Sequence, residues 1–292
     1  MKMLMAFWSY DDDAELERGM LQSGDQLLLK RLVAGETLQL DEKEKNSIDA
    51  LVNYSAFEKL SFPPSDFPNC KIAVRAGVGF DNLDCAGWGK QAVPVCNVPD
   101  YGTTEVADHA IALMLSLTRG TAAYHRMLSK APFNAWRFAD APLVQRLRGA
   151  VFGVIGMGRI GMATALRARA FGMRILFYDP HLPSGVELSL GFERVLDLES
   201  LVSQADVMSI HAPLDQSTER LINRNLLGVG KRGQILVNTA RGPIVDLDAV
   251  YECLQSGQLG GAGLDVLPEE PANPSHPPVS YTHLRAHETI AD

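Results

Sequence analysis

The sequence predicts an α/β fold in which parallel strands alternate with helices. From residue 149 onward, apolar segments of about five residues alternate with helical segments of about ten, as in successive βαβ units. The glycine-rich hexapeptide GMGRIG at 156–161 stands where one of these strands gives way to a helix. At 292 residues the chain also exceeds the usual size of a single core, which favours two domains.

Four short apolar segments in the first hundred residues predict the strands of a small parallel sheet. They are MLMAFW near the start, IDALVNY (48–54), KIAVRAG (71–77) and VPVCNVP (93–99). The charged segment DDDAELERGML between the first two predicts an amphipathic helix. The apolar start MKMLMAFW ends before Asp11–Asp13 and is too short for a signal peptide or a membrane span, so we interpret it as a buried first strand.

Residues 103–120, TTEVADHAIALMLSLTRG, show a clear helical pattern. The apolar positions that share one face are Val106, Ala110, Met114 and Leu117, widened by Ala107, Ile111 and Leu115. Thr103 or Thr104 can cap the start of this helix, and Gly120 can end it. Because the helix is apolar over more than half of its circumference, we expect it to be buried, either within its own domain or against a second subunit.

The second half of the chain predicts a larger parallel sheet with helices on both faces. Its expected strands are residues 150–156, 174–179, 206–211, 234–238 and 261–266. Its expected helices are residues 159–172, 198–205 and 246–257. The first of these helices ends on Gly172, a residue type that commonly terminates helices.

Composition excludes several classes of function. The net charge of −8 and the pI near 5.4 argue against broad binding to nucleic acid or to anionic membranes, which requires clustered lysine and arginine. A small molecule or a protein is the expected partner. The four cysteines show neither CxxC nor metal-ligand spacing and are too few for a disulfide scaffold. We therefore expect no metal site and a cytoplasmic location in which Cys70, Cys85, Cys96 and Cys253 are buried thiols.

The hexapeptide GMGRIG has the GxGxxG spacing of a dinucleotide-binding turn, formed by Gly156, Gly158 and Gly161. It follows an expected strand, opens an expected helix, and precedes Asp179 at the end of the next strand, 18 residues after Gly161. The three glycines permit a tight turn, the approach of a pyrophosphate, and close packing of helix on strand. Asp179 can accept hydrogen bonds from the adenosine ribose but would repel a 2′-phosphate, and no arginine follows it in PHLP. The expected cofactor is therefore NAD rather than NADP.

Several further stretches resemble one protein family. They are RAGVGFDNLD (75–84), NVPDYGTTEVADHA (97–110), HAPLDQST (211–218), NTARGPIVD (238–246) and GAGLDVLPEEP (261–271). Together they resemble the D-isomer-specific 2-hydroxyacid dehydrogenases, especially the C-terminal-binding-protein-like branch, over roughly residues 48–277. The resemblance implies a Rossmann NAD-binding domain inserted in a flavodoxin-like substrate domain, with the active site between them. The implied domains are 1–101 for substrate, 102–271 for NAD, and 272–292 for a C-terminal return.

The resemblance implies an NAD-dependent oxidoreductase that transfers a hydride between NAD(H) and a small D-2-hydroxy acid or 2-oxo acid. Arg241 in NTARG matches the family's catalytic arginine, whose planar guanidinium suits the substrate carboxylate and carbonyl oxygen. Glu270 in PEEP matches the glutamate that orients the family's catalytic histidine and raises the pKa of that histidine. The backbone N–H groups of Val78 and Gly79 would bind the substrate carboxylate, and Arg75 would either assist them or pair with an acid.

The resemblance also implies which residues line the cofactor. They are Gly156, Gly158, Arg159, Ile160, Gly161, Asp179, His211, Ala212, Pro213, Thr239, Ala240, Arg241 and Asp265. Asp265 would lie near the nicotinamide carboxamide, or else cap a helix or turn. His211 would shape the nicotinamide ribose side rather than act in catalysis, and Thr218 would cap the next helix. His109 lies opposite the apolar face of its helix or at the edge of that face and is expected to be structural.

The chain departs from the family's pattern near its end. The family's general acid and base is a histidine in a TPH-x-A segment after the PEEP loop, and we find no such segment. His283 and His287 lie in YTHLRAHE without the flanking residues of that segment, and His276 belongs to a His-Pro turn. We therefore interpret residues 278–292 as a foreign or frameshifted end that truncates the family's sequence. Loss of the proton donor would lower turnover by about 10²- to 10⁴-fold, while NAD binding would survive in part.

Two alternatives to this function stay open. The first is an NADH-responsive dimer like the C-terminal-binding proteins, which recruit short peptides through the N-terminal domain. The second is a phosphite or formate dehydrogenase of the same superfamily, which differs only in substrate. A homodimer through the helix at 103–119 is expected from the family and from the wide apolar face of that helix. The identity of the acid and the direction of flux stay open.

Overall fold

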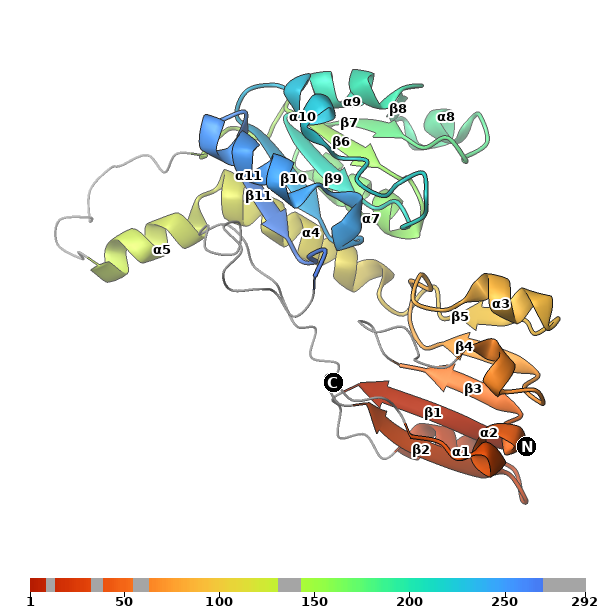
Figure 1. The fold of residues 1–292 in the computed structure, drawn as a ribbon. Helices are drawn as coiled ribbons and strands as arrows, with labels where there is room; N and C mark the ends of the chain where they lie inside the picture. Colours follow the sequence, from red (N-terminus) through yellow and green to blue (C-terminus); the bar gives the residue numbers. More distant parts are fainter. Residues whose placement is uncertain (9–13, 33–38, 55–62, 131–142, 270–292) are drawn as a thin grey trace. The chain divides into compact units, whose positions relative to one another are not determined.

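The chain divides into two compact units, each built around its own parallel sheet (Figure 1). Unit 1 is Met1–Gly102 and unit 2 is Thr103–Asp292. The computed structural model describes residues 1–8, 14–32, 39–54, 63–130 and 143–269. The predicted α/β fold with parallel sheets is confirmed.

Unit 1 contains a five-stranded sheet with the order β2-β1-β3-β4-β5, in which every pairing is parallel. Its strands are β1 (Lys2–Trp8), β2 (Gln26–Leu32), β3 (Ala50–Asn53), β4 (Ile72–Arg75) and β5 (Val95–Asn97). Its helices are α1 (Glu15–Met20), α2 (Glu42–Ser47) and α3 (Cys85–Lys90), with a 3₁₀ turn η1 (Pro64–Asp66). This strand order is the flavodoxin-like one.

The strand that the apolar pattern does not predict is β2. It lies at the edge of the sheet beside β1, and Leu27–Lys30 are only half-buried. A half-buried edge strand lacks the continuous burial that marks the inner strands in the sequence. The core of unit 1 gathers residues around Phe67 and Trp88, whose rings stack with centroids 6.3 Å apart.

Unit 2 contains a six-stranded sheet with the order β11-β10-β9-β6-β7-β8, also parallel throughout. Its strands are β6 (Val151–Ile155), β7 (Arg174–Tyr178), β8 (Glu193–Arg194), β9 (Val207–Ile210), β10 (Gln234–Asn238) and β11 (Leu259–Leu264). Its helices are α4 (Thr103–Thr118), α5 (Thr121–Lys130), α7 (Arg159–Ala170), α8 (Val186–Leu190), α9 (Leu198–Gln204), α10 (Arg224–Gly228) and α11 (Leu247–Ser256), with a 3₁₀ turn η2 (Gly242–Ile244). The order reverses between β6 and β9, which makes this a Rossmann sheet with its switch point there.

Helices cover both faces of this second sheet. One apolar core joins the sheet to α9, α10 and α11, and the other joins it to α4 and α7 (Figure 1). The strands β6, β9 and β10 are buried along their whole length. That double-sided burial explains why their sequences read as continuous apolar runs.

The apolar face of α4 is buried within its own unit. Its buried residues are Ala107, Ala110, Ile111, Leu113, Met114, Leu117 and Thr118, while Val106 and Leu115 are half-buried. Gly261 and Gly263 of β11 let the helix approach closely, since a Cβ on Gly263 would lie 3.0 Å from Cβ of Leu113. The intramolecular alternative therefore accounts for this face. Gly120, with φ +65°, follows the helix as expected.

Some expectations need correction. Cys70 and Cys253 are buried, but Cys85 and Cys96 are exposed, because α3 and β5 present them to solvent. Thr218 caps no helix: its hydroxyl donates to the Pro213 carbonyl in a turn, and Asn223 caps α10 instead. The short elements α8, β8 and α10 and the helix α5 were not predicted. Within the described ranges, no helix is long and apolar enough to cross a membrane.

Candidate functional site

The glycine-rich turn joins β6 to α7 at the carboxyl end of the central strand. Gly156 has φ +87°, and a Cβ on it would lie 2.7 Å from the backbone nitrogen of Ala212, so a larger residue does not fit. A Cβ on Gly161 would lie 2.1 Å from the carbonyl oxygen of Gly156. A Cβ on Gly158, in contrast, would meet no atom within 4 Å, and no side chain caps the start of α7. This open, uncapped helix start, with Arg159 and Ile160 in its first turn, fits a pyrophosphate.

Asp179 follows β7 and holds the glycine-rich turn in place. Its Oδ2 accepts a hydrogen bond from the N–H of Met157 at 2.9 Å. Its Oδ1 accepts from the N–H groups of His181 (2.9 Å) and Leu182 (3.2 Å). A carboxylate offers about four acceptor positions, so Asp179 keeps capacity for a ribose hydroxyl. The contact with the turn is a role that the sequence pattern did not predict.

Arg194 in β8 fixes the loop that follows β7. Its two terminal nitrogens donate to the carbonyl oxygens of Leu182 and Pro183 at 3.0 and 2.9 Å. Its Nε lies 3.1 Å from Glu187, and its guanidinium lies over the ring of Phe177. Sequence reasoning missed Arg194, because a lone arginine in an unpredicted two-residue strand carries no motif.

His211, Ala212 and Pro213 leave the carboxyl end of β9 on the other side of the switch point. The backbone N–H of His211 donates to the Ile155 carbonyl at 2.8 Å, which ties this end to β6. Its Nε2 lies 2.8 Å from the hydroxyl of the buried Ser209. Burial away from water lowers the pKa of His211 to about 3, so its imidazole is neutral at ordinary pH. A neutral, half-buried ring favours the expected shaping role over catalysis.

The loop after β10 contains Thr239, Ala240 and Arg241, and hydrogen bonds with the Asn238 side chain hold it in place. The fully buried Asn238 accepts from the Ala240 N–H at 3.0 Å and donates to the Arg241 carbonyl at 2.9 Å. The Arg241 guanidinium donates to the Ala240 carbonyl at 2.7 Å. The buried hydroxyl of Thr239 makes no hydrogen bond within the described part of the chain, which leaves it for a ligand.

The loop after β11 packs against the loop after β10. A Cβ on Gly242 would lie 2.0 Å from the backbone of Leu267, and the Asp265 N–H donates to the Asn238 carbonyl at 3.0 Å. Oδ1 of Asp265 lies 3.1 Å from Nε2 of His109, which reaches it from α4. The Asp265 carboxylate raises the pKa of His109 above its ordinary value, while burial acts in the opposite direction. Asp265 thus has a side-chain partner that the sequence did not reveal.

In unit 1, the predicted substrate loop follows β4. Asn97 donates from Nδ2 to the Val78 carbonyl at 2.7 Å, and the Val98 N–H donates to the Gly77 carbonyl at 3.1 Å. The N–H groups of Val78 and Gly79 make no hydrogen bond to any part of the chain that the structure describes, as an anion-binding loop requires. Arg75 is buried and donates to the carbonyl oxygens of Asn53 and Ala76, a backbone contact that neither expectation for it included.

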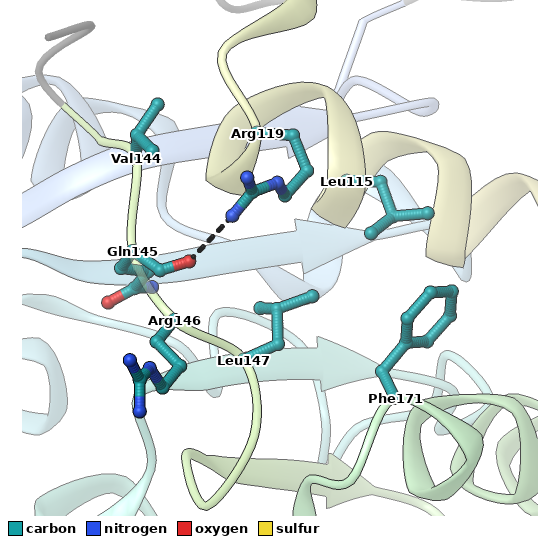
Figure 2. A pocket seen from close by; sticks show the side chains of 7 residues that line it. All are labelled: Leu115, Arg119, Val144, Gln145, Arg146, Leu147 and Phe171. Atoms are coloured by element: carbon teal, nitrogen blue, oxygen red, sulfur yellow. Dashed lines mark hydrogen bonds between the residues drawn. The ribbon is translucent and has the colours of Figure 1, made fainter.

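A pocket in unit 2 lies at the other end of the sheet (Figure 2). It is lined by Leu115, Arg119, Val144, Gln145, Arg146, Leu147 and Phe171. Leu147 precedes β6 and Phe171 precedes β7, so the pocket faces the amino ends of these strands. Nucleotides bind at the carboxyl ends in such sheets, and we therefore do not assign the cofactor to this pocket.

Unit 2 thus brings together its predicted cofactor residues and Arg241 along one edge of its sheet. The described residues do not include Glu270 or residues 272–292, which contain His276, His283 and His287. The roles of these residues therefore stay predictions. Sequence reasoning missed Ser209 and Asn238, although each stands in a buried strand where a polar residue is unusual and signals a specific partner. Within the described residues, no cluster of metal-ligating side chains is found.

Comparison with known proteins identifies this site's family. The family model described as D-isomer specific 2-hydroxyacid dehydrogenase, NAD binding domain, matches residues 111–287, ten residues beyond the end at 277 that the motifs suggested. A D-3-phosphoglycerate dehydrogenase of Methanocaldococcus jannaschii is 39% identical over 201 residues, which are 69% of this chain and 38% of the relative. A glyoxylate reductase of Korarchaeum cryptofilum is 39% identical over 213 residues, 72% of this chain and 63% of the relative.

Among solved structures, the chain is similar to an NADPH-dependent glyoxylate/hydroxypyruvate reductase from Sinorhizobium meliloti in complex with NADP and malonate. The TM-score is 0.82 at 28% identity, covering 98% of this chain and 85% of that one. The alignments to the two relatives named above span less than two thirds of each relative's length. Four expectations stay predictions: the C-terminal-binding-protein-like branch, the homodimer, the cytoplasmic location and the truncated end. The chain belongs to the D-isomer specific 2-hydroxyacid dehydrogenase family and carries that family's NAD-binding domain.

Proposed function

We propose that this chain is an NAD-dependent oxidoreductase acting between a small D-2-hydroxy acid and the corresponding 2-oxo acid. One observation supports this most strongly. The glycine-rich turn with Asp179, which suits a dinucleotide, and Arg241, which suits a carboxylate, lie at the carboxyl edge of the same sheet. Hydride transfer requires a cofactor and an acid substrate side by side, and the carboxyl ends of these strands offer a binding group for each.

The residues of unit 2 would hold NAD in an extended pose across the switch point. The start of α7 would bind the pyrophosphate, and Asp179 would accept from the ribose hydroxyls. His211, Thr239 and Asp265 would line the nicotinamide half, because the adenosine half lies on the β7 side. When bound, the cofactor supplies or accepts the hydride.

Discrimination against NADP would come from two contacts. Asp179 places a negative charge where the 2′-phosphate of NADP would lie. Arg194, the nearby cation, already donates to the Leu182 and Pro183 carbonyls and faces Glu187. It therefore has little capacity to turn toward a phosphate. The NADP-bound Sinorhizobium relative has the same fold, so the preference would depend on these side chains rather than on the fold.

Arg241 would orient the substrate by its carboxylate and polarise its carbonyl oxygen, as a planar guanidinium does for two oxygens. In unit 1, the N–H groups of Val78 and Gly79 are proposed to bind the same class of carboxylate. Glu270 is proposed to act with a histidine proton donor that the described residues do not include.

The test measures binding and turnover separately on the full chain. NADH binding is followed by its fluorescence, and NADH oxidation is followed by absorbance with a panel of 2-oxo acids. Arg241→Lys should leave the Kd for NADH nearly unchanged and lower kcat/KM by about 10²-fold, because Lys lacks the two-oxygen fork. Arg119→Lys, the same change at the opposite end of the sheet, should alter neither. NADH binding without oxidation by any 2-oxo acid would contradict the oxidoreductase, and no NADH binding would contradict the site itself.

A further inference from the structure

His109 forms an ion pair with Asp265 at the end of β11, and the proposed function assigns His109 no role. Nε2 of His109 lies 3.1 Å from Oδ1 of Asp265, and the two side chains are 26% and 19% exposed. The pair joins α4 to the loop after β11, and the backbone of that loop is held by the Asn238 carbonyl. The geometry of the pair is therefore fixed by two packed elements rather than by two mobile surface side chains.

The position of the pair along the sheet determines which part of a nucleotide it meets. Asp179 marks the β7 side as the adenosine half, so the opposite half of a bound dinucleotide extends over β9, β10 and β11. Asp265 follows the last of these strands. A charge on this pair thus acts on the nicotinamide end, which is the part that differs between the two oxidation states.

Other charged residues lie on α4 and in the loops after β10 and β11, but unlike His109 they do not ordinarily change charge between about pH 5 and 8. On α4, Asp108 pairs with Arg167 of α7, and Glu105 accepts from the Thr104 hydroxyl. Arg241 stands after β10 and Glu269 after β11. Between about pH 5 and 8 arginine keeps its charge, whereas histidine is the side chain that ordinarily titrates. Burial lowers the pKa of His211 after β9 to about 3, so His211 stays neutral in that range. Among the described residues around the pair, the imidazole of His109 is thus the group that changes the local charge.

We propose that His109 determines which oxidation state of the cofactor this chain binds more tightly. The inference rests on the proposed NAD site. The nicotinamide ring of NAD⁺ carries a positive charge that NADH lacks. With neutral His109, the Asp265 carboxylate attracts that charge and favours NAD⁺. With protonated His109, the carboxylate is compensated and the preference for NAD⁺ decreases.

Two measurable consequences follow from this charge balance. The ratio of the Kd for NADH to the Kd for NAD⁺ should rise with pH through the titration of His109, by about three- to tenfold for charges separated by several ångströms near a protein surface. By linkage, NAD⁺ binding should release a fraction of a proton within that pH range, whereas NADH binding should not. Proton release is independent of any turnover.

The experiment titrates the full chain with NAD⁺ and with NADH by calorimetry from mildly acidic to mildly basic pH, in buffers of different ionisation enthalpy. His109→Gln keeps a donor near Asp265 but never carries charge, so it should fix the Kd ratio at its high-pH value and abolish proton release. The matched control is His125→Gln, on the exposed His125 of α5, which should retain both effects. Asp265→Asn should lower the ratio of the Kd for NADH to the Kd for NAD⁺ at every pH. It tests the same charge balance independently of His109→Gln.

The outcomes separate this inference from the proposed function. If NAD⁺ and NADH both bind, but the ratio is independent of pH or His109→Gln behaves like the wild type, the role of His109 is overturned while the NAD site stands. If neither form binds, the proposed site and this inference both fail. A pH-dependent ratio that His125→Gln abolishes as well would assign the effect to overall charge and overturn the inference.

Discussion

In unit 2 the carboxyl ends of the strands fall into two halves, a first half at β6 and β7 and a second half at β10 and β11. Different kinds of contact fix the geometry of each half. At the carboxyl ends of β6 and β7 the backbone sets it, because Gly156 and Gly161 lie where a Cβ would collide with backbone atoms. At the carboxyl ends of β10 and β11 the side chains set it, through Asn238 within its loop and through His109 facing Asp265. The first half should therefore be sensitive to added bulk, and the second to lost donors and changed charge.

The largest effect is expected from bulk in the first half. In Gly161→Ala the new Cβ would lie 2.1 Å from the Gly156 carbonyl oxygen, which is backbone and cannot move without opening the turn. Overpacking of this kind costs about 1–3 kcal/mol or more of unfolding free energy. Urea unfolding should show this loss, and NADH titration should show binding reduced beyond detection.

Gly158→Ala is the matched control, because the same methyl group there meets no atom within 4 Å and φ is −71°. Its unfolding free energy should stay within about 0.5 kcal/mol of the wild type. Its NADH affinity should nevertheless fall, since the methyl group occupies the space proposed for the pyrophosphate. Unchanged NADH affinity in Gly158→Ala would contradict that placement.

The difference between the halves also explains what the sequence was able to predict. The glycine-rich turn was predicted because its glycines stand a few positions apart in the sequence, after a strand whose double-sided burial leaves a continuous apolar run. The edge strands β2 and β8 escaped prediction because β2 holds only three successive apolar residues, Leu27–Leu29, between polar ones, and β8 is two charged residues long. The central strands and the edge strands β5 and β11 were thus predictable, whereas the edge strands β2 and β8 were not.

In the second half, the sequence located single residues but not their partners. Asp265 and Arg241 stand in recognisable motifs, whereas His109 and Asn238 act through contacts that only the folded chain creates. His109 was expected to be structural because its position on the helix says nothing about the end of β11, a strand far along the chain. Tertiary packing of α4 on β10 and β11 supplies that information.

An intermediate effect is expected from removing one donor in the second half. Asn238→Asp can still accept from the Ala240 N–H, but it loses the donor to the Arg241 carbonyl and buries a negative charge. We expect a loss of about 1–3 kcal/mol in unfolding free energy. We also expect kcat/KM to fall by about tenfold or more, with little change in the Kd for NADH, because the loop of Arg241 is displaced.

The matched control for this change is Asn223→Asp. Asn223 caps α10 by accepting from the Leu226 N–H, a role that aspartate performs equally well. Its stability and kinetics should match the wild type. If Asn238→Asp weakened NADH binding and turnover by the same factor, Asn238 would be a general structural residue rather than one that positions Arg241.

The smallest effect is expected from protonation in the second half. The Asp265 carboxylate raises the pKa of His109 in the folded state, so the pair stabilises the fold fully below the unfolded value of about 6.5 and ceases to do so as pH rises through the folded value. Solvent screens these partly exposed side chains, which limits the contribution to less than about 1 kcal/mol. Urea unfolding of the wild type and of His109→Gln should therefore show a difference that shrinks as pH rises. A difference that stays constant with pH would mean that His109 contributes by packing rather than by charge, and the second half would then depend on shape as the first does.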